Sequence, residues 1–375
     1  MIRSFKYRLY PTKAQKARLG NTLALCCDLY NAGLEQRISV FRANHVSLNY
    51  RNQAGELPCV VEEIPDFNQV YSQTRQDVLR RGDKSFKGFF RRLKTREKPG
   101  YPRFRGKRRY DSFTYPQNGF GIKDGRLYLA KLGSFRIKLH RPITGTVKTC
   151  AVKREVDQWF AVFSCEIPDT IKLKINEFND VGIDVGIEHF LVSSDGEFIA
   201  NAFPLKKSRK RLRRAQKSLC RKMKGSNRRK KQRILVAKLH RKIRRQREDF
   251  LHKVSRMLVD KYDVFYLEDL RINNMLKNHR LAFHIQDASW GSFINFLSYK
   301  AEEAGKEVVF VDPRGTSQRC SQCGNIVKKD LSQRLHLCPF CGFQAQRDFN
   351  SALEIKRLGR SLQALTRPDV TVRVA

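Results

Sequence analysis

The sequence of 375 residues has no uninterrupted apolar run of 18 or more residues, which excludes a membrane-spanning helix. Its first residues, MIRSFK, lack the apolar segment of a secretory signal peptide, so we expect the protein to stay in the cytoplasm. Thiols are reduced there, and disulfides are not expected among the ten cysteines. Six cysteines have no metal-ligand spacing and are interpreted as buried or incidental thiols: Cys26, Cys27, Cys59, Cys150, Cys165 and Cys220.

Acidic residues are scarce. The chain has 36 Asp and Glu against 76 Lys and Arg, which gives a formal net charge of +40. A compact chain with this charge repels itself unless a polyanion neutralises it, and cations docked on phosphate release condensed counterions. Nucleic acid is therefore the expected partner. A structural basic protein of the ribosomal type is the alternative that charge alone leaves open.

The imbalance is greatest in residues 205–247, where 22 of 43 positions are Lys or Arg and none is acidic. The segment Gly225-Ser226-Asn227 divides this stretch into two arms of a predicted helical hairpin. A block of like charge can also be a disordered tail, but an apolar seam and the internal position favour ordered helices on a phosphate backbone. The expected seam consists of Leu205, Leu212, Leu219, Leu235, Leu239 and Ile243.

The first half of the chain alternates between strand and helix patterns. Residues 2–10 alternate as a half-exposed strand, and Thr12 with Gln15 forms a capping box before an amphipathic helix. A second helix is predicted near 67–94, with Phe86, Phe89, Phe90 and Leu93 on one side. Residues 95–118 form a basic, aromatic loop, and 119–168 read as short strands of a small β-barrel. The buried stripe of the first helix would be Leu19, Leu23, Cys26, Tyr30, Leu34, Ile38 and Phe41.

The second half has the pattern of an α/β layer fold. Three strands are predicted in 181–202, with Asp195-Gly196 as a hairpin turn, and buried strands at 263–269 and 307–312. An amphipathic helix is expected at 289–305 and a final helix at 348–358. Strands mixed with helices in this order favour a layered sheet over a helix bundle.

Four cysteines have the spacing of a metal site. Cys320 and Cys323 form one CxxC-Gly unit, and Cys338 and Cys341 form another after 14 intervening residues. Two such knuckles supply the four sulfurs of a closed tetrahedral zinc site, with no open position for a substrate. We therefore predict one structural zinc ion. A redox role for CxxC would explain one pair but not both.

Three acidic residues stand in unusual surroundings. Asp184 lies in the apolar segment VGIDVG, Glu268 ends the apolar segment VFYLE, and Asp348 begins a helix directly after the cysteines. A carboxylate in an apolar strand is costly unless it is paired or ligated. Nucleases that use two metal ions hold Mg²⁺ or Mn²⁺ with a few converging carboxylates.

Each acid also has an ordinary interpretation. Asp184 could cap a turn, Glu268 could be a strand-end charge and Asp348 could be a helix N-cap. Their order along the chain (strand, strand end, helix start) matches an RNase H-like fold, which brings its acids to one sheet edge. Asp180, Asp269 and Asp287 are weaker candidates, and a shift of one residue would exchange Asp269 for Glu268.

These segments resemble the TnpB family of transposon-encoded RNA-guided nucleases. The resemblance spans nearly the whole chain and is carried by six motifs: FKYRLYPTKAQ, KPGYPRFRGKRRYDSFTYPQ, GIDVGIEHF, YLEDLRINNM, DASWGSFINFLSYKAEEAGKEVVFVDPRGTSQRCSQCG and CPFCGFQAQRDFNSALEI. The resemblance implies that Asp184, Glu268 and Asp348 are the three RuvC acids, so that the catalytic set is intact. They would hold two Mg²⁺ or Mn²⁺ ions, with Asp184 bridging both.

The resemblance also implies an α+β multidomain fold. A β-barrel wedge domain (1–10 and 119–178) would carry an inserted helical recognition domain (11–118). A RuvC nuclease domain of the RNase H-like type (179–317) would contain the basic hairpin 205–247. The remaining segments would be a zinc ribbon (318–343) and the final RuvC helix with its tail (344–375), for which Thr366 suggests an end of the helix.

The family implies a noncoding guide RNA and double-stranded target DNA next to a short adjacent motif as partners, with a monomeric protein associated with the nucleoid. The hairpin and loop 98–110 would hold the RNA and heteroduplex through the backbone. Two rival functions remain open: a guide-free transposase, and an RNA-guided repressor with a silent site. Five aromatic residues could stack on bases or anchor the loop to its own domain, namely Tyr101, Phe104, Tyr110, Phe113 and Tyr115. In the second helix, Gln73, Arg75 and Gln76 could read base edges of the adjacent motif.

Overall fold

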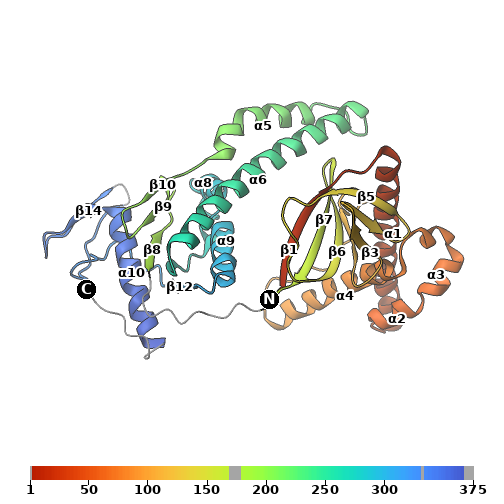
Figure 1. Cartoon of the computed structure of the whole chain (residues 1–375), viewed down its shortest axis with the longest axis horizontal. Coiled ribbons are helices and arrows are strands. Elements are labelled where there is room, and N and C mark those ends of the chain that lie inside the picture. Colours follow the sequence, from red (N-terminus) through yellow and green to blue (C-terminus); the bar gives the residue numbers. More distant parts are fainter. Residues whose placement is uncertain (1, 169–178, 331–332, 367–375) are drawn as a thin grey trace. The chain divides into compact units, whose positions relative to one another are not determined.

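A computed structural model of the chain describes residues 2–168, 179–330 and 333–366. The chain divides into two compact units, Met1–Asp169 and Thr170–Ala375, and each is described by itself (Figure 1). Within the described ranges, no helix combines the length and apolarity that a membrane crossing needs.

The first unit is built on a seven-stranded sheet. Its strands are β1 (Ile2–Leu9), β2 (Ser112–Tyr115), β3 (Phe120–Lys123), β4 (Arg126–Leu129), β5 (Gly133–Lys138), β6 (Thr146–Glu155) and β7 (Gln158–Glu166). They pair in the order β2-β6-β7-β1-β5-β4-β3. The first strand of the chain therefore lies between strands that follow it by more than 120 residues, antiparallel to both.

The strands predicted in 119–168 are present. The turn Asp124-Gly125 joins β3 to β4 with φ values of 47° and 67°, as a two-residue hairpin requires. Strand β2 was not predicted, because its residues lie in the stretch read as a basic loop. Closure of the sheet into a barrel stays a prediction, since no β2–β3 pairing occurs among the described residues.

Helices α1 (Lys13–Asn44) and α4 (Ser72–Lys94) pack on β2 of this sheet. The shorter α2 (Tyr50–Gly55), α3 (Leu57–Glu63) and η1 (Pro65–Gln69) pack against these two helices and one another. The predicted capping box is confirmed, with Thr12 and Gln15 exchanging hydrogen bonds. The predicted stripe of α1 is confirmed from Leu19 to Ile38 but wrong at Phe41, which is 51% exposed. On α4 the buried residues are Thr74, Val78, Leu79 and Asp83, and of its predicted apolar side Phe86 packs against the core whereas Phe90 and Leu93 are exposed.

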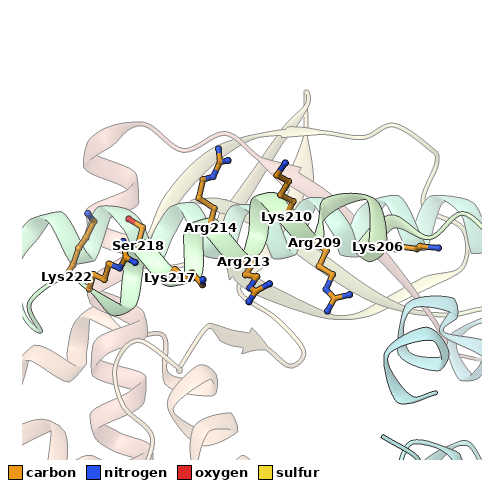
Figure 2. Close-up of a pocket in the computed structure, with 9 residues that line it drawn as sticks. Lys206, Arg209, Lys210, Arg213, Arg214, Lys217, Ser218 and Lys222 are labelled. Carbon is orange, nitrogen blue, oxygen red and sulfur yellow. The ribbon is translucent and has the colours of Figure 1, made fainter. Parts of the chain in front are cut away.

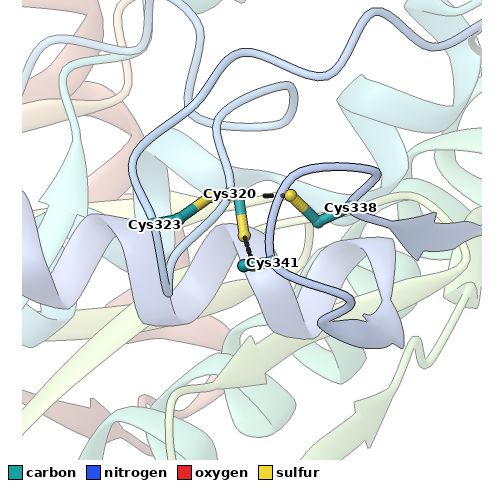
Figure 3. A group of neighbouring side chains, drawn as sticks. All are labelled: Cys320, Cys323, Cys338 and Cys341. Carbon is teal, nitrogen blue, oxygen red and sulfur yellow. Dashed lines mark hydrogen bonds between the residues drawn. The ribbon is translucent and has the colours of Figure 1, made fainter.

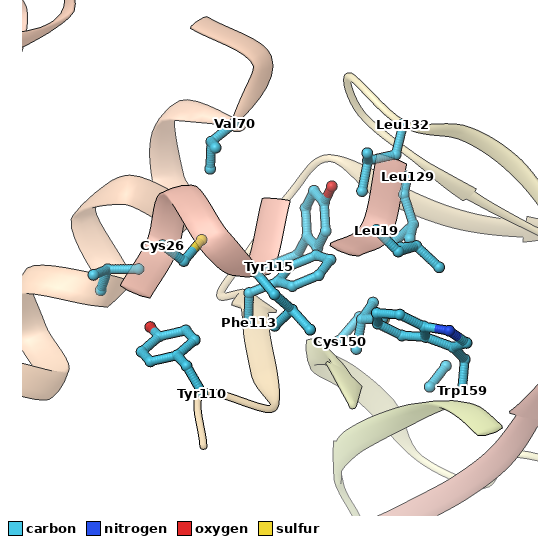
Figure 4. Close-up of a cluster of buried hydrophobic side chains, with 14 of the residues drawn as sticks. Leu19, Cys26, Val70, Tyr110, Phe113, Tyr115, Leu129, Leu132, Cys150 and Trp159 are labelled. Atoms are coloured by element: carbon cyan, nitrogen blue, oxygen red, sulfur yellow. The ribbon is translucent and has the colours of Figure 1, made fainter. Parts of the chain in front are cut away.

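The core of the first unit joins α1 and α4 to the sheet (Figure 4). Phe113 and Tyr115 of β2 lie in it beside Leu19, and the Tyr115 hydroxyl donates to the carbonyl of Ala130. Burial raises the pKa of the Cys26 thiol to about 12. Cys26, Cys27, Cys150 and Cys165 are buried thiols as predicted, whereas Cys59 and Cys220 are exposed.

The second unit contains a five-stranded sheet in the order β10-β9-β8-β11-β12. Its strands are β8 (Asp180–Asp184), β9 (His189–Ser193), β10 (Phe198–Ala200), β11 (Val264–Glu268) and β12 (Glu307–Val311). Strands β8, β11 and β12 are parallel neighbours, and β9 and β10 are antiparallel. All five strands were predicted. Strand β12 is an edge strand with Phe310 43% exposed, so its prediction as a buried strand is wrong.

Helices cover both faces of this sheet (Figure 1). Phe265 and Leu267 of β11 belong to a core shared with α6 (Asn227–Lys261), α8 (Ala282–Ala288) and α9 (Trp290–Glu303). Val264 and Tyr266, which alternate with them, pack instead with Ile355 of α10 (Arg347–Thr366). Side chains at the end of each strand are thereby assigned to one face or the other.

Helix α10 approaches the sheet unusually closely at two glycines. A Cβ atom on Gly182 of β8 would lie 2.1 Å from the carbonyl oxygen of Ala352, and one on Gly359 would lie 2.1 Å from the Tyr266 ring. Neither position can accept a larger residue unless backbone or a buried aromatic ring moves. Because glycine has no side chain at these two positions, α10 can lie this close to the strands.

The basic stretch forms two helices, α5 (Pro204–Cys220) and α6. They pack through a seam that was predicted correctly except at one position: Leu235 is 42% exposed, and the neighbouring Val236 is buried. Helix α6 continues to Lys261 and enters the core of the second unit. The hairpin is thus an ordered extension of the sheet domain. Between β11 and α8 lies the short α7 (Ile272–Met275), and β13 (Leu335–Leu337) and β14 (Gln344–Gln346) precede α10.

Candidate active site and zinc site

The three predicted acids lie on the face of the sheet that α10 covers. Leu267 pairs with Ile183, so the next residues along these parallel strands, Glu268 and Asp184, lie side by side. By alternation, both point to the same face as Gly182 and Tyr266, which contact α10. Asp348 is in the first turn of α10 and is 8% exposed. The fold brings the three acids to one edge of the sheet.

The electrostatics of Asp184 show that these acids are close enough to interact. Burial, with the negative charges of Glu268 and Asp348, raises the pKa of Asp184 well above its usual value. Arg347 opposes this shift and forms an ion pair with Asp348 at 3.1 Å. Burial also raises the pKa of Glu268, while a hydrogen bond from Thr316 opposes that increase. Three carboxylates thus share this edge, and Arg347 supplies a positive charge beside them.

The neighbouring acids have other roles. Asp180 is paired with Arg360 at 2.6 Å and with Lys356 at 3.2 Å. Although burial acts in the opposite direction, these partners lower the pKa of Asp180. Asp269 is exposed beyond the end of β11, so it does not share the position of Glu268. The structure therefore separates Asp184, Glu268 and Asp348 from these two weaker candidates.

The donor set of the three acids fits divalent cations. Carboxylate oxygens are the ligands that Mg²⁺ and Mn²⁺ prefer, and the excess negative charge raises the affinity for a cation. Their oxygens do not all lie within 4.8 Å of one another, a condition that only the four cysteines meet among the described residues. This spacing does not suit one ion in a single shell. A pair of ions about 3.5–4 Å apart does not require all donors to converge on one point.

The four cysteines form a compact cluster (Figure 3). The sulfur of Cys320 lies 3.7 Å from that of Cys341, and the sulfur of Cys323 lies 3.5 Å from that of Cys338. Zn–S bonds of about 2.3 Å in a tetrahedron place sulfurs about 3.8 Å apart. The distances therefore fit one tetrahedral zinc ion.

The two knuckles have the same backbone geometry. Gly324 donates its N–H to the carbonyl of Cys320 at 2.9 Å, and Gly342 donates to Cys338 at 3.0 Å. Their φ values, 74° and 73°, lie in the left-handed region that favours glycine. Despite the opposing effect of burial, N–H groups of Cys341 and Phe340 lower the pKa of Cys338 to about 6, which favours a thiolate. Each knuckle is therefore shaped by hydrogen bonds within its own short turn.

Helix α5 carries a continuous cationic face (Figure 2). The lysines and arginines of this face recur every three or four residues. From Lys206 to Arg221 the face is about 22 Å long, at 1.5 Å of helix per residue. No carboxylate pairs with them among the described residues. This face borders a pocket of about 860 Å³. The residues that line the pocket are Lys206, Arg209, Lys210, Arg213, Arg214, Lys217, Ser218, Arg221 and Lys222.

A buried aspartate fixes the base of this helix. Asp287 of α8 accepts hydrogen bonds from the backbone N–H groups of Leu205 and Lys206 at 3.0 and 2.9 Å. Arg247 of α6 donates to the same carboxylate at 3.2 Å. Asp287, a weaker candidate for the metal site, is therefore the N-terminal cap of α5. Sequence reasoning missed this role because cap and helix are about 80 residues apart.

The aromatic residues of the first unit divide into two groups. Tyr110, Phe113 and Tyr115 are buried anchors of their own unit, whereas Tyr101 and Phe104 are 49% and 53% exposed. The backbone of loop 98–110 is held on α1 where Asn31 hydrogen-bonds to both backbone groups of Arg105. Base stacking stays a prediction for the two exposed rings only.

The proposed readers of base edges have partners inside the unit. Gln73 accepts a hydrogen bond from the N–H of Asn118, and Arg75 donates to the carbonyl of Phe67. Contact of these residues, or of Gln76, with DNA stays a prediction. At the acidic edge, sequence reasoning also missed Arg347 and Thr316. The basic residue directly before a helix-start acid could have suggested Arg347, but nothing local marks Thr316.

Comparison with sequence families gives three matches. A family described as "Probable transposase" matches residues 162–279, and a Cas12f1-like TNB domain matches residues 290–355. A domain described as helix-turn-helix matches residues 1–45. In this structure that range contains one strand and one long helix, β1 and α1. The first two matches together contain all three acids and all four cysteines.

Similar proteins cover almost the whole chain. A "Putative RNA-guided DNA endonuclease" of Streptomyces pristinaespiralis is 35% identical, over 96% of this chain and 90% of that protein. InsQ of Escherichia coli, with the same description, is 29% identical over 97% and 94%. A TnpB-like protein of Acanthamoeba polyphaga mimivirus is 27% identical over 60% and 46%. A cryo-EM structure of a Cas12f1–sgRNA–target DNA complex aligns over 95% of this chain and 99% of that chain. The TM-score is 0.37 and the identity is 16%, and this likeness is too distant to support an inference.

Proposed function

This chain belongs to the TnpB family, and from that premise we propose that it is an RNA-guided DNA endonuclease that hydrolyses phosphodiester bonds with divalent metal ions. The guide RNA would pair with one strand of the target duplex beside a short adjacent motif, and a single RuvC-type site would cut the DNA. The observation that carries the proposal is the meeting of Asp184, Glu268 and Asp348 at the sheet edge under α10.

The division of labour among the acids follows from their electrostatic environment. Asp184 lies beside Glu268 on the neighbouring strand, and the charges of both Glu268 and Asp348, after burial, raise its pKa, so Asp184 would be the acid shared by two ions. Glu268 and Asp348 would each complete the coordination of one ion. When bound, the ions supply activation of water and neutralisation of the charge that develops on the phosphate. Arg347 holds Asp348 in place and keeps one positive charge at the edge.

The four cysteines would hold one structural zinc ion. A closed four-sulfur site leaves no position for substrate, so the ion would stabilise the ribbon and take no part in hydrolysis. The ribbon lies directly between β12 and α10 in the chain. The end of the ribbon leads directly into the first turn of α10, which carries Asp348.

The cationic face of α5 would bind the phosphate backbone of the guide RNA or heteroduplex. Backbone contacts of this kind leave sequence selection to base pairing. Asp287 and Arg247 fix the base of the helix, so the cations are presented on an ordered element.

The first test is cleavage by an Asp184→Ala variant. We expect a loss of roughly a thousandfold in single-turnover cleavage, or about 4 kcal/mol at 1.36 kcal/mol per tenfold, because the shared ligand is gone. Affinity for RNA and for target should stay within about twofold of wild type, since the substitution removes none of the cations of α5. Normal cutting by this variant would refute the site assignment.

The guide is tested by sequencing the RNA that copurifies with the protein. A defined RNA with a variable end supports a guided nuclease, and random cellular RNA contradicts it. Cleavage or joining of transposon-end DNA by RNA-free protein would favour the guide-free transposase. A complex that binds target but shows no metal-dependent cleavage would favour the silent repressor.

The cationic face is tested by the triple substitution Arg209→Gln, Arg213→Gln and Lys217→Gln, along one row of α5. Each lost phosphate contact on single-stranded RNA should lower the slope of log affinity against log salt by about 0.7, or about 2 in total. The matched control is Lys253→Gln on α6, whose ammonium group is paired with Asp249 at 2.8 Å and should contribute little. An unchanged slope in the triple variant would exclude α5 as the RNA-binding face.

A further inference from the structure

The segment between β12 and the first cysteine knuckle contacts the acidic site directly. Thr316 lies in this segment, is 3% exposed, and donates its hydroxyl to Glu268 at 2.5 Å. The carbonyl of Pro313 is a second acceptor at 3.1 Å. Among the described residues, Thr316 is the only hydrogen-bond donor to the Glu268 carboxylate.

A second contact reaches the same knuckle from α10. Asn350 is fully buried two residues after Asp348. Its side chain accepts from the N–H of Ser321 at 3.0 Å and donates to the carbonyl of Arg319 at 2.8 Å. Ser321 and Arg319 are the two neighbours of Cys320. One amide side chain therefore fastens the first turn of α10 to the backbone on both sides of a zinc ligand.

An ion pair one turn farther along α10 strengthens this attachment. Glu354 is fully buried and lies 3.6 Å from the guanidinium of Arg319 and 2.7 Å from that of Arg357. Arg357 donates to both Glu354 oxygens at 2.7 and 2.8 Å and holds this carboxylate in place. Glu354 therefore presents a fixed negative charge to the guanidinium of Arg319. The Cys320 knuckle is thus held against α10 by both an amide and a carboxylate.

We propose that Thr316 and Asn350 are positioning residues of the nuclease, through which the Cys320 knuckle sets the orientations of Glu268 and Asp348. The inference rests on the proposed function, because it assigns these residues to the same metal-binding acids. Thr316 acts on Glu268 through its hydroxyl. Asn350 acts on Asp348 by fixing the helical turn that carries it. Neither residue touches the substrate, and each acts through a carboxylate.

A fixed orientation matters because the three acids come from separate elements and repel one another. Without its hydroxyl partner, Glu268 is free to turn its carboxylate toward solvent and away from Asp184, which raises the cost of assembling the site. Partners that orient metal ligands in this way typically contribute 10–100-fold to metal affinity. The ribbon would therefore raise metal affinity at the acids without contributing a ligand.

The experiment compares Thr316→Val, which keeps the shape and removes the hydroxyl, with Thr316→Ser, which restores it. Mn²⁺ binding to full-length protein stripped of nucleic acid is measured by electron paramagnetic resonance of the free ion. The Mg²⁺ concentration for half-maximal cleavage is measured on the guide-loaded complex. We expect Thr316→Val to weaken Mn²⁺ binding and to raise the Mg²⁺ requirement, each about tenfold, and Thr316→Ser to stay within about threefold of wild type.

Asn350→Ala should weaken Mn²⁺ binding in the same direction, with one zinc ion per chain retained in every variant. The matched control is Ser255→Ala, which removes a buried hydroxyl that donates to Leu251 inside α6. It should lower the midpoint of thermal unfolding and leave Mn²⁺ binding unchanged, which separates lost stability from lost positioning.

Two results would overturn the inference: wild-type Mn²⁺ affinity in Thr316→Val, or equal weakening in Thr316→Ser and Thr316→Val. Failure of the proposed function has a different signature. In that case wild-type protein would not cleave guided targets, or Asp184→Ala would bind Mn²⁺ as wild type does. A protein that cleaves, depends on Asp184 and ignores the loss of the Thr316 hydroxyl would retain the function and refute only the positioning role.

Discussion

The second unit contains two sets of candidate metal-ligand side chains that differ in how the chain assembles them. The four cysteines come from two short knuckles, and their sulfurs lie within 4.8 Å of one another. The three acids come from β8, β11 and α10, and their oxygens do not meet that condition. Thiols in a local turn need only a few hydrogen bonds to converge. Carboxylates of like charge repel one another, so they stay close only because the folded sheet and α10 hold them there.

This contrast teaches that the two sets relate to stability in opposite ways. The cysteine cluster is favourable once metal is bound, because binding of a structural zinc ion is coupled to folding of the ribbon. The acid cluster is unfavourable until cations arrive, because burial and mutual repulsion raise the pKa of Asp184. Removal of one member should therefore destabilise the protein in the first set and stabilise it in the second.

Among tests of this contrast in stability, the largest effect is expected from breaking the cysteine set with Cys338→Ser. The zinc content should fall from one ion per chain to near zero, and residues 318–343 should become sensitive to protease. Cleavage should fall by about tenfold or more, since Asn350 of α10 is bonded to the backbone on both sides of Cys320 and Thr316 lies four residues before that cysteine. Cys220→Ser is the control, because this exposed thiol lies outside the ribbon. Full activity without zinc would show that the ribbon and the acids are independent.

A smaller effect of opposite sign is expected from Asp184→Asn in protein without added divalent cations. Because the pKa of Asp184 is raised on folding, the folded state binds its proton more tightly than the unfolded chain does. The free energy of unfolding therefore falls as pH rises from about 3.9 through the raised pKa. Asn carries no charge, so the variant should lack this decrease and unfold a few degrees higher at pH 7.

Thermal unfolding of both proteins between pH 4 and pH 8 measures this difference. Added Mg²⁺ should raise the midpoint of the wild type more than that of the variant, since the ions bind the folded site. A variant that is less stable than wild type at pH 7 would contradict the view of the acids as a repulsive set.

The smallest effect is expected from Asp269→Asn, which sharpens the comparison within the acids. Asp269 is adjacent in sequence to Glu268 but is exposed beyond the strand. The variant should cleave within about twofold of wild type and unfold within about one degree of it, as surface substitutions usually do. Loss of cleavage comparable to that in Glu268→Gln would mean that the register of β11 assigns the ligand wrongly.

Much of the second unit was predictable because its signals are local. The apolar runs around Asp184 and Glu268 indicate buried strands, and a carboxylate within such a run is conspicuous. The cysteine spacing predicted the knuckles for the same reason. The position of Asp348 directly after the ribbon predicted the start of α10.

What sequence reasoning missed depends on distant partners. Leu235 was placed in the hairpin seam, but α6 turns Val236 toward α5, because a helix of 35 residues takes its orientation from the core that its far end enters. Strand β2 lies in a stretch of basic and aromatic residues and becomes a strand only by pairing with β6. Thr316 and Asp287 act on residues 48 and about 80 positions away.

The glycine contacts under α10 have a consequence for engineering of this protein. Gly182 lies two residues before Asp184. The space that a larger side chain would need at this position is occupied by the backbone of α10 at Ala352. In a library of random variants, this position should tolerate no replacement, although it has no catalytic group. Even alanine would force the helix off the strand and carry Asp348 away from its companions. A screen for activity would then identify Gly182 as essential, although this residue contributes only by having no side chain.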